Sequence, residues 1–164
     1  MSPGSGGVAA GDGERRTVIQ DGRAKAYRPL PIEERAAAYR AGLAAYRRGD
    51  FFEAHELLEP AWMGTDDPVE RALHQGLIKL AAGFVHAVRG NPAGVRKNLV
   101  GARPRLAAAE AGGAAGGLAG GRIRGLDLTR LIAEIDARLA DLDAGRPVTA
   151  ADAPRVHPSR RRSP

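Results

Sequence analysis

The feature that most constrains this chain is a series of glycine-centred breaks, each followed by a signal that starts a new helix. The breaks lie at 49–50, 64–68 and 90–92, and each joins a glycine, which tolerates a left-handed turn, to a capping side chain or a proline. Between the breaks, apolar residues recur at helical spacing, and no segment shows sustained strand alternation. The chain is therefore predicted to be all-α.

Five helices are expected. In the second helix Asp50 and Glu53 are predicted to form a capping box, and in the third Asp67 caps the helix ahead of Pro68. Pro104 must end or bend the fourth helix, because proline cannot donate a backbone hydrogen bond. The expected bounds are about 31–49 for the first helix, 68–89 for the third, 91–102 for the fourth and 127–145 for the fifth, with the second beginning at 50.

The helices are predicted to form one domain over residues 31–145, a compact bundle of two stacked helical hairpins plus a C-terminal helix. The second hairpin is inferred because the segment GNPAGV faintly echoes the turn of the first. Residues 109–125, inside the domain, are too rich in glycine for a stable helix and are interpreted as a flexible linker. Residues 1–30 and 146–164, the latter basic, are predicted to be disordered tails.

The net charge of +6 comes from the tails, because residues 31–145 hold 15 basic and 15 acidic residues. Nucleic-acid binding is therefore not expected except weakly through the tails, and the acidic second helix would repel phosphate. The absence of cysteine excludes disulfides and thiolate metal sites. No apolar run approaches the ~20 residues of a membrane span, so a cytoplasmic protein without membrane contact is expected.

The first two helices resemble a tetratricopeptide-type hairpin. Small residues at Gly42 and Ala54 favour a close approach of two antiparallel helices, and Gly49 allows a tight turn between them. This pattern predicts a closely packed helical hairpin at the start of the domain.

The densest chemistry lies in the stretch GDFFEAHELLEPAW, residues 49–62. On a helical wheel His55 shares a face with apolar residues that include Trp62, and Glu59 follows one turn later. A buried imidazole needs a partner, because an unpaired one costs ~1–3 kcal/mol. Two interpretations remain open. One is a structural His55–Glu59 pair that holds the hairpin in register, and the other is a ligand or acid–base pair in which Glu56 is a further carboxylate.

The third helix is predicted to be central, because both of its faces are poor in charge. It brings Gln75 and His86 toward the interior, although about 16 Å of helix separates them. His74, near the helix start, is expected to be exposed. His55, Glu59 and His86 are also candidates for a three-ligand metal site, although HELLE lacks the second histidine of the zinc-protease pattern.

Three sequence blocks can be recognised together. They contain Ala54, His55, Glu56, Leu58, Glu59 and Trp62; then Gln75, Gly76, Leu77, Ile78, Ala81, Ala82 and His86; then Gly90, Asn91 and Gly94. In this combination they resemble the bacterial family known as domain of unknown function three-hundred-and-nine, over about residues 33–106. The resemblance implies a small all-helical domain and supplies no activity.

The leading hypothesis is a binding or assembly protein whose polar side chains gather between the two hairpins. The alternative is a metal-dependent or acid/base enzyme, hydrolase-like, that uses His55, Glu59 and His86. The sequence indicates no cofactor. A partner would be another protein or a second copy of the chain, for which the apolar stripe of the fifth helix is a candidate surface. The expected polar cluster consists of His55, Glu56, Glu59, Trp62, Gln75, His86 and Asn91.

Overall fold

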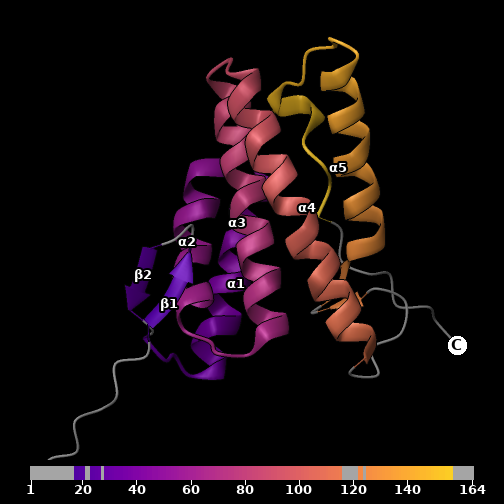
Figure 1. Ribbon diagram of the computed structural model, residues 1–164. Coiled ribbons are helices and arrows are strands. Elements are labelled where there is room, and N and C mark those ends of the chain that lie inside the picture. The colour runs from indigo at the N-terminus through magenta and orange to yellow at the C-terminus, as the bar shows by residue number, and fades with distance from the viewer. Residues whose placement is uncertain (1–16, 21–22, 27, 116–121, 124, 157–164) are drawn as a thin grey trace, which may run out of the picture.

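The computed structural model describes residues 17–20, 23–26, 28–115, 122–123 and 125–156. These residues form five α-helices, which confirms the predicted all-α class (Figure 1). The helices are α1 Ile32–Arg47, α2 Phe51–Met63, α3 Pro68–Val88, α4 Pro92–Ala115 and α5 Leu128–Asp143. Two short antiparallel ribbons and a 3₁₀-helix accompany them: β1 Thr17–Gln20 with β2 Arg23–Ala26, β3 Arg122–Ile123 with β4 Leu126–Asp127, and η2 Ala150–Asp152.

Each helix packs against the next one along the chain, so the bundle has the expected order of hairpin, hairpin and C-terminal helix. The α3–α4 pair occupies the centre, with the α1–α2 hairpin on one side and α5 on the other (Figure 1). Among the helices of the described ranges, none has both the length and the apolar character that crossing a membrane requires.

The glycine-centred breaks are where the sequence places them. Gly49 and Gly90 have φ values of 81° and 67°, in the left-handed region that favours glycine, as does Gly145 after α5 with 73°. Gly64, at the remaining break, has a φ of −91° and ends α2 without a left-handed turn. At the start of α3 the predicted cap is confirmed, because the Asp67 carboxylate accepts a hydrogen bond of 2.8 Å from the backbone nitrogen of Glu70.

The capping box predicted at the start of α2 is wrong. The Asp50 side chain makes no capping hydrogen bond there. The Glu53 carboxylate instead accepts a hydrogen bond of 3.0 Å from the guanidinium of Arg48. A charged partner from the preceding turn therefore replaces the backbone as the partner of Glu53.

The fourth helix is longer than predicted, because it runs through Pro104 to Ala115 and includes the first part of the predicted linker at 109–125. Val100 and Pro104 are exposed, so the carbonyl group that loses its intrahelical partner lies on the solvent side. The opposite face is anchored by the fully buried residues Ala102, Leu106 and Ala109. Packing thus overrides the low helix propensity of this segment. The rest of the predicted linker includes residues 116–121 and 124, which lie outside the described residues.

Close packing of α3 and α4 depends on glycines that accept side chains from the other helix. A methyl group added to Gly76 would lie 2.7 Å from Leu106 Cγ, and one added to Gly101 would lie 2.8 Å from Lys79 Cδ. The ring of His86 covers Gly94 in the same way, near the turn between the two helices. The two helices therefore approach closely along their length.

The fifth helix uses its apolar stripe inside the chain. Leu128, Leu131, Ile132 and Ile135 are buried, and the helix packs against α4. Charged and polar pairs link the two helices at regular steps in an antiparallel register; they join Arg96 to Asp143, Arg103 to Asp136 and Glu110 to Thr129. The stripe that suggested an assembly surface is thus largely covered within the monomer.

The structure differs from the predicted tails at both ends of the domain. Residues 17–20 and 23–26 form the β1–β2 ribbon, and the backbone nitrogen of Leu30 donates to the carbonyl oxygen of Gly64 at 3.0 Å. Residues 146–156 pack back onto the bundle, and Val156 is 4 % exposed. Residues 1–16 and 157–164 lie outside the described part of the chain.

We predict that Gly76→Ala destabilises the protein by about 1–3 kcal/mol, because the new methyl group must displace Leu106 and α4 with it. The matched control is Gly83→Ala, whose methyl group would lie 3.4 Å from Asn98 Cβ, an ordinary contact. This control should be neutral or stabilising, because alanine favours a helix interior over glycine by up to about 1 kcal/mol. Urea denaturation gives both free energies of unfolding, and equal effects of the two substitutions would contradict the packing account.

Candidate functional site

The predicted polar residues lie at three separate places on the surface and between helices. The first is on α2, where the core face is formed by Phe51, Ala54, Leu58, Ala61 and Trp62. His55 lies beside this face, with 32 % of its side chain exposed, so the expectation that it is buried among core residues is wrong. The physical reason is that the buried face is centred near Leu58, and His55 lies about 60° from Leu58 around the helix, at the edge of this face.

The His55 imidazole contacts the carboxylate of its neighbour Glu56. Its Nδ1 lies 3.2 Å from Glu56 Oε1, where the carboxylate accepts the hydrogen bond. Ligand atoms of His55, Glu56 and Glu59 all lie within 4.8 Å of one another, an arrangement that could hold a metal ion at the surface. His86 does not belong to this group, so within the described residues the structure does not assemble the predicted set of His55, Glu59 and His86.

Trp62 connects α2 to α3. Its side chain is 1 % exposed, and the guanidinium carbon of Arg71 lies 5.3 Å from the centre of the ring. A cation at this distance over an aromatic face is attracted by the ring quadrupole. Trp62 therefore contributes to packing between α2 and α3.

The second place is the turn between α3 and α4, where His86 and Asn91 meet. Asn91 Oδ1 accepts a hydrogen bond of 3.1 Å from the backbone nitrogen of Gly94, which caps α4. The amide nitrogen of Asn91 therefore faces His86 Nδ1, at 3.1 Å. Because an amide nitrogen can only donate, His86 Nδ1 accepts, and the neutral ring carries its hydrogen on Nε2. The network thus fixes the tautomer of His86.

His86 and Asn91 line a shallow groove of about 660 Å³ on the outer side of α3 and α4. The other side chains with polar groups in the lining are Lys79, Lys97 and Asn98, and no acidic residue lines it. The first turn of α4, which borders the groove, also has no acidic residue. The groove therefore combines two ammonium groups, an imidazole donor and the positive end of a helix dipole.

Gln75 lies in the third place, a separate depression between α3 and α4. Arg71 and Arg105 line this depression together with Asp66, so it is not uniformly basic. The Arg105 guanidinium donates a hydrogen bond of 2.7 Å to the carbonyl oxygen of Gly101. The structure thus separates Gln75 from the His86–Asn91 pair, as the spacing along the helix predicts.

A buried polar cluster between α1 and α3 was not predicted. The Glu70 carboxylate is bound by the Arg35 guanidinium, with an Nε–Oε1 distance of 3.2 Å, and by the Thr65 hydroxyl at 3.1 Å. His74, expected to be exposed, is fully buried, and its ring centre lies 5.8 Å from that of Tyr39. The helix wheel could not show this, because α3 is covered by α1 as well as by α2 and α4.

One of the comparisons with known proteins finds a similarity to a family. The family described as "Domain of unknown function (DUF309)" has a model that matches residues 39–98, which confirms the resemblance seen in the sequence. Every residue that lines the groove with His86 and Asn91 falls within this range. No curated protein and no solved structure matches the chain.

We predict that Asn91→Asp moves the hydrogen of the neutral His86 ring from Nε2 to Nδ1. The carboxylate keeps the cap on Gly94 but can no longer donate, so it favours a donor on the facing ring nitrogen. Nitrogen-15 NMR of the imidazole distinguishes the two tautomers. Asn91→Ala is the companion variant, and it should lose about 1 kcal/mol of stability through the missing cap. An unchanged tautomer in Asn91→Asp would contradict the assigned network.

Proposed function

We propose that this chain, whose residues 39–98 match the DUF309 family model, is a binding protein for a small phosphate-bearing anion. The site is the groove between α3 and α4 that contains Lys79, His86 and Lys97, called the basic groove below. The observation that carries the proposal is the composition of its lining. Two ammonium groups, one imidazole and two amides line one concave surface, and none of the described lining residues is acidic.

The basic groove offers hydrogen-bond donors in fixed positions. Asn91 holds the His86 ring by its Nδ1, which leaves Nε2–H as the remaining donor of that ring. The ring lies on Gly94, where a side chain of any other residue would collide with it. The Lys79 stem packs over Gly101, so its ammonium group is carried on a supported chain. Pre-positioned donors of this kind favour binding because less conformational entropy is lost.

Lys97 adds a cation at the edge of the groove. It lies in the second turn of α4, is exposed, and makes no ion pair with the described residues. The start of α4 adds a partial positive charge, because the dipoles of its peptide groups are aligned along the helix. An anion in the groove would therefore meet the Lys97 ammonium group and the helix end together.

The chemistry favours a compact, polar anion over nucleic acid. The lining contains no Phe, Tyr or Trp on which a base could stack, and base stacking is a main contribution to binding of single strands. Binding of nucleic acid through the tails stays a prediction, as does assembly with another protein. The arrangement gives no support to the metal-dependent enzyme, because His86 lies outside the cluster of His55, Glu56 and Glu59.

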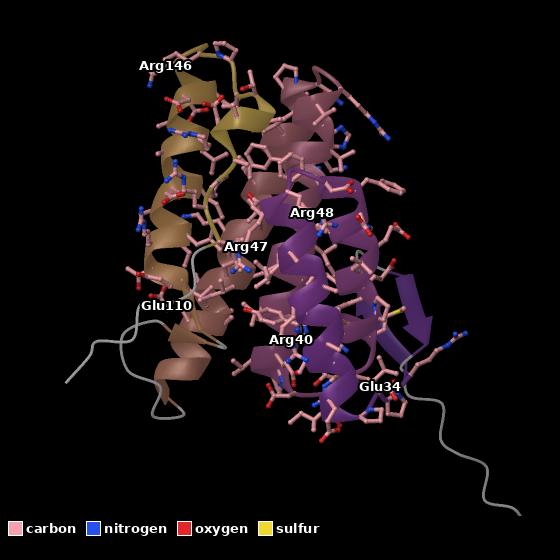
Figure 2. All side chains as sticks on the ribbon, turned by 180° about the vertical axis from the view of Figure 1, so that it is seen from behind. Glu34, Arg40, Arg47, Arg48, Glu110 and Arg146 are labelled. Atoms are coloured by element: carbon pink, nitrogen blue, oxygen red, sulfur yellow. The ribbon has the colours of Figure 1, made fainter. Side chains whose placement is uncertain are left out.

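We predict that pyrophosphate binds with a one-to-one stoichiometry and shifts the backbone amide NMR signals of residues 93–98. Lys97→Gln should weaken this binding by about fivefold, since an exposed charge pair contributes up to about 1 kcal/mol. The matched control is Arg40→Gln, which removes the same charge from α1, on the face of the molecule seen in Figure 2. Titrations at constant ionic strength separate a local effect from general screening.

The proposal would be contradicted if pyrophosphate shifted no signal at the start of α4. It would also be contradicted if Lys97→Gln and Arg40→Gln weakened binding equally, because a diffuse effect of net charge would then explain the affinity. A larger loss in Lys97→Gln alone would place the anion in the basic groove.

A further inference from the structure

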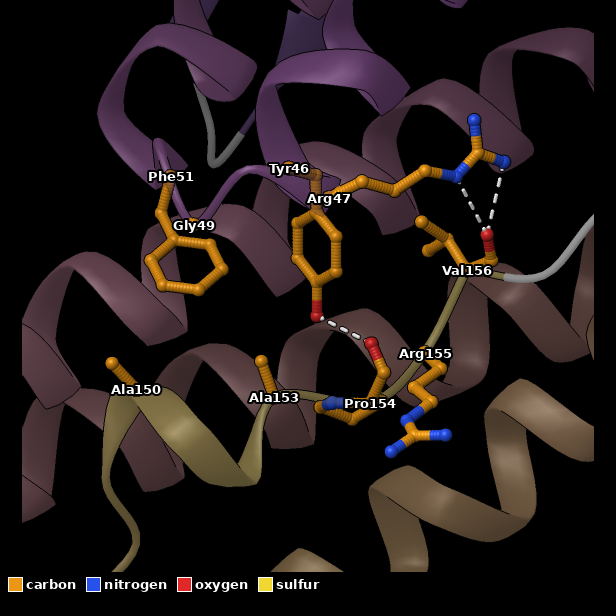
Figure 3. A pocket seen from close by; sticks show the side chains of 9 residues that line it. All are labelled: Tyr46, Arg47, Gly49, Phe51, Ala150, Ala153, Pro154, Arg155 and Val156. Atoms are coloured by element: carbon orange, nitrogen blue, oxygen red, sulfur yellow. Dashed lines mark hydrogen bonds between the residues drawn. The ribbon is translucent and has the colours of Figure 1, made fainter.

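A cavity of about 550 Å³ lies where the C-terminal segment crosses the turn between α1 and α2 (Figure 3). One wall comes from the end of α1 and the start of α2, with Tyr46 and Phe51. The other wall comes from residues 150–156, which lie outside the part of the chain that matches the family model. The cavity is therefore formed partly by residues that match the family model and partly by residues outside the match.

The interior of the cavity is largely apolar. The Tyr46 and Phe51 rings meet edge to face with centres 5.2 Å apart, and Ala150, Ala153 and Val156 contribute apolar groups from the opposite wall. The Tyr46 hydroxyl donates a hydrogen bond of 2.9 Å to the carbonyl oxygen of Pro154 (Figure 3). Burial raises the pKa of Tyr46, with a further contribution from Glu134, so the phenol stays neutral and keeps this donor role.

The C-terminal segment is held mainly through its backbone, so its position is well defined. Arg47 Nε and Nη2 donate to the carbonyl oxygen of Val156 at 3.0 Å and 2.9 Å (Figure 3). The backbone nitrogen of Arg155 donates to Glu134 Oε2 at 2.7 Å. Hydrogen bonds from Thr149 lower the pKa of Asp152, which keeps the carboxylate ionised in the turn at the start of η2.

The charged groups around the cavity are both cationic. Arg47 uses two of its three nitrogens on Val156, and the guanidinium of Arg155 makes no hydrogen bond or ion pair with the described residues. No acidic residue lines the cavity. The Glu134 carboxylate of α5, which contacts the segment, already accepts hydrogen bonds from the Arg155 backbone and from Arg130. An anionic head group at the rim would therefore find an unused guanidinium.

From these observations we propose a second ligand site, which binds a small carboxylate with an apolar body. The carboxylate pairs with the Arg155 guanidinium, a planar fork that matches its two oxygens, and the apolar body enters the space beside Phe51. A volume of this size, apolar walls and few polar groups are typical of small-molecule sites. The site is independent of the basic groove, because the two share no lining residue.

Isothermal titration calorimetry with octanoate tests this site on the full chain. We expect one bound octanoate per chain, and Arg155→Gln should weaken binding about tenfold, as for loss of a hydrogen bond to a charged group. Ala150→Phe, which fills the cavity from an exposed position, should abolish binding while leaving both guanidinium groups in place. Arg40→Gln is the control for net charge. Octan-1-ol and octylamine test the need for a negative head group.

Octanoate binding that survives both Arg155→Gln and Ala150→Phe would overturn the proposal, and so would the absence of binding to the unmodified chain. Equal affinity for octan-1-ol would show that the guanidinium groups play no part and would also overturn it. Pyrophosphate binding measured on the same variants keeps the two sites distinct. Loss of octanoate binding with unchanged pyrophosphate binding is the result expected for Ala150→Phe.

Discussion

Close contact between α3 and α4 is the interaction on which the rest of this structure depends. Leu106 of α4 lies over Gly76 of α3, while side chains of α3 lie over Gly94 and Gly101 of α4. Such reciprocal contacts let two helices pack at a short distance and bury continuous apolar faces. The α1–α2 hairpin and α5 then pack on opposite sides of this pair.

The same glycines position the groups of the basic groove. Because Gly94 has no side chain, the His86 ring can lie against the start of α4 and reach Asn91. Because Gly101 has none, the Lys79 stem can cross α4 toward the groove. The glycines that allow close packing of α3 and α4 therefore also position the hydrogen-bond donors of the basic groove.

The sequence could predict features that depend on local signals. The glycine breaks and the Asp67 cap are of this kind, because each is decided within a few residues. The path of α4 through Pro104 could not be predicted in this way, since burial of Leu106 and Ala109 against other helices outweighs the local signal. The predicted exposure of His55 and His74 was also wrong, because a helical wheel shows which residues share a face but not which faces are covered by other helices. The packing of the C-terminal segment could not be predicted for a similar reason. Tyr46 and Arg47 donate to its backbone carbonyl groups, which are present whatever the side chains of the segment are.

Locating an anion directly would test the central claim, that the basic groove is a binding site. Tungstate, an anomalously scattering analogue of phosphate, can be located in crystals of the protein from its anomalous signal. The account predicts a tungstate ion among Lys79, His86 and Lys97, with His86 Nε2 within hydrogen-bond distance of an oxygen. Ordered tungstate found only elsewhere, with the basic groove empty, would contradict it.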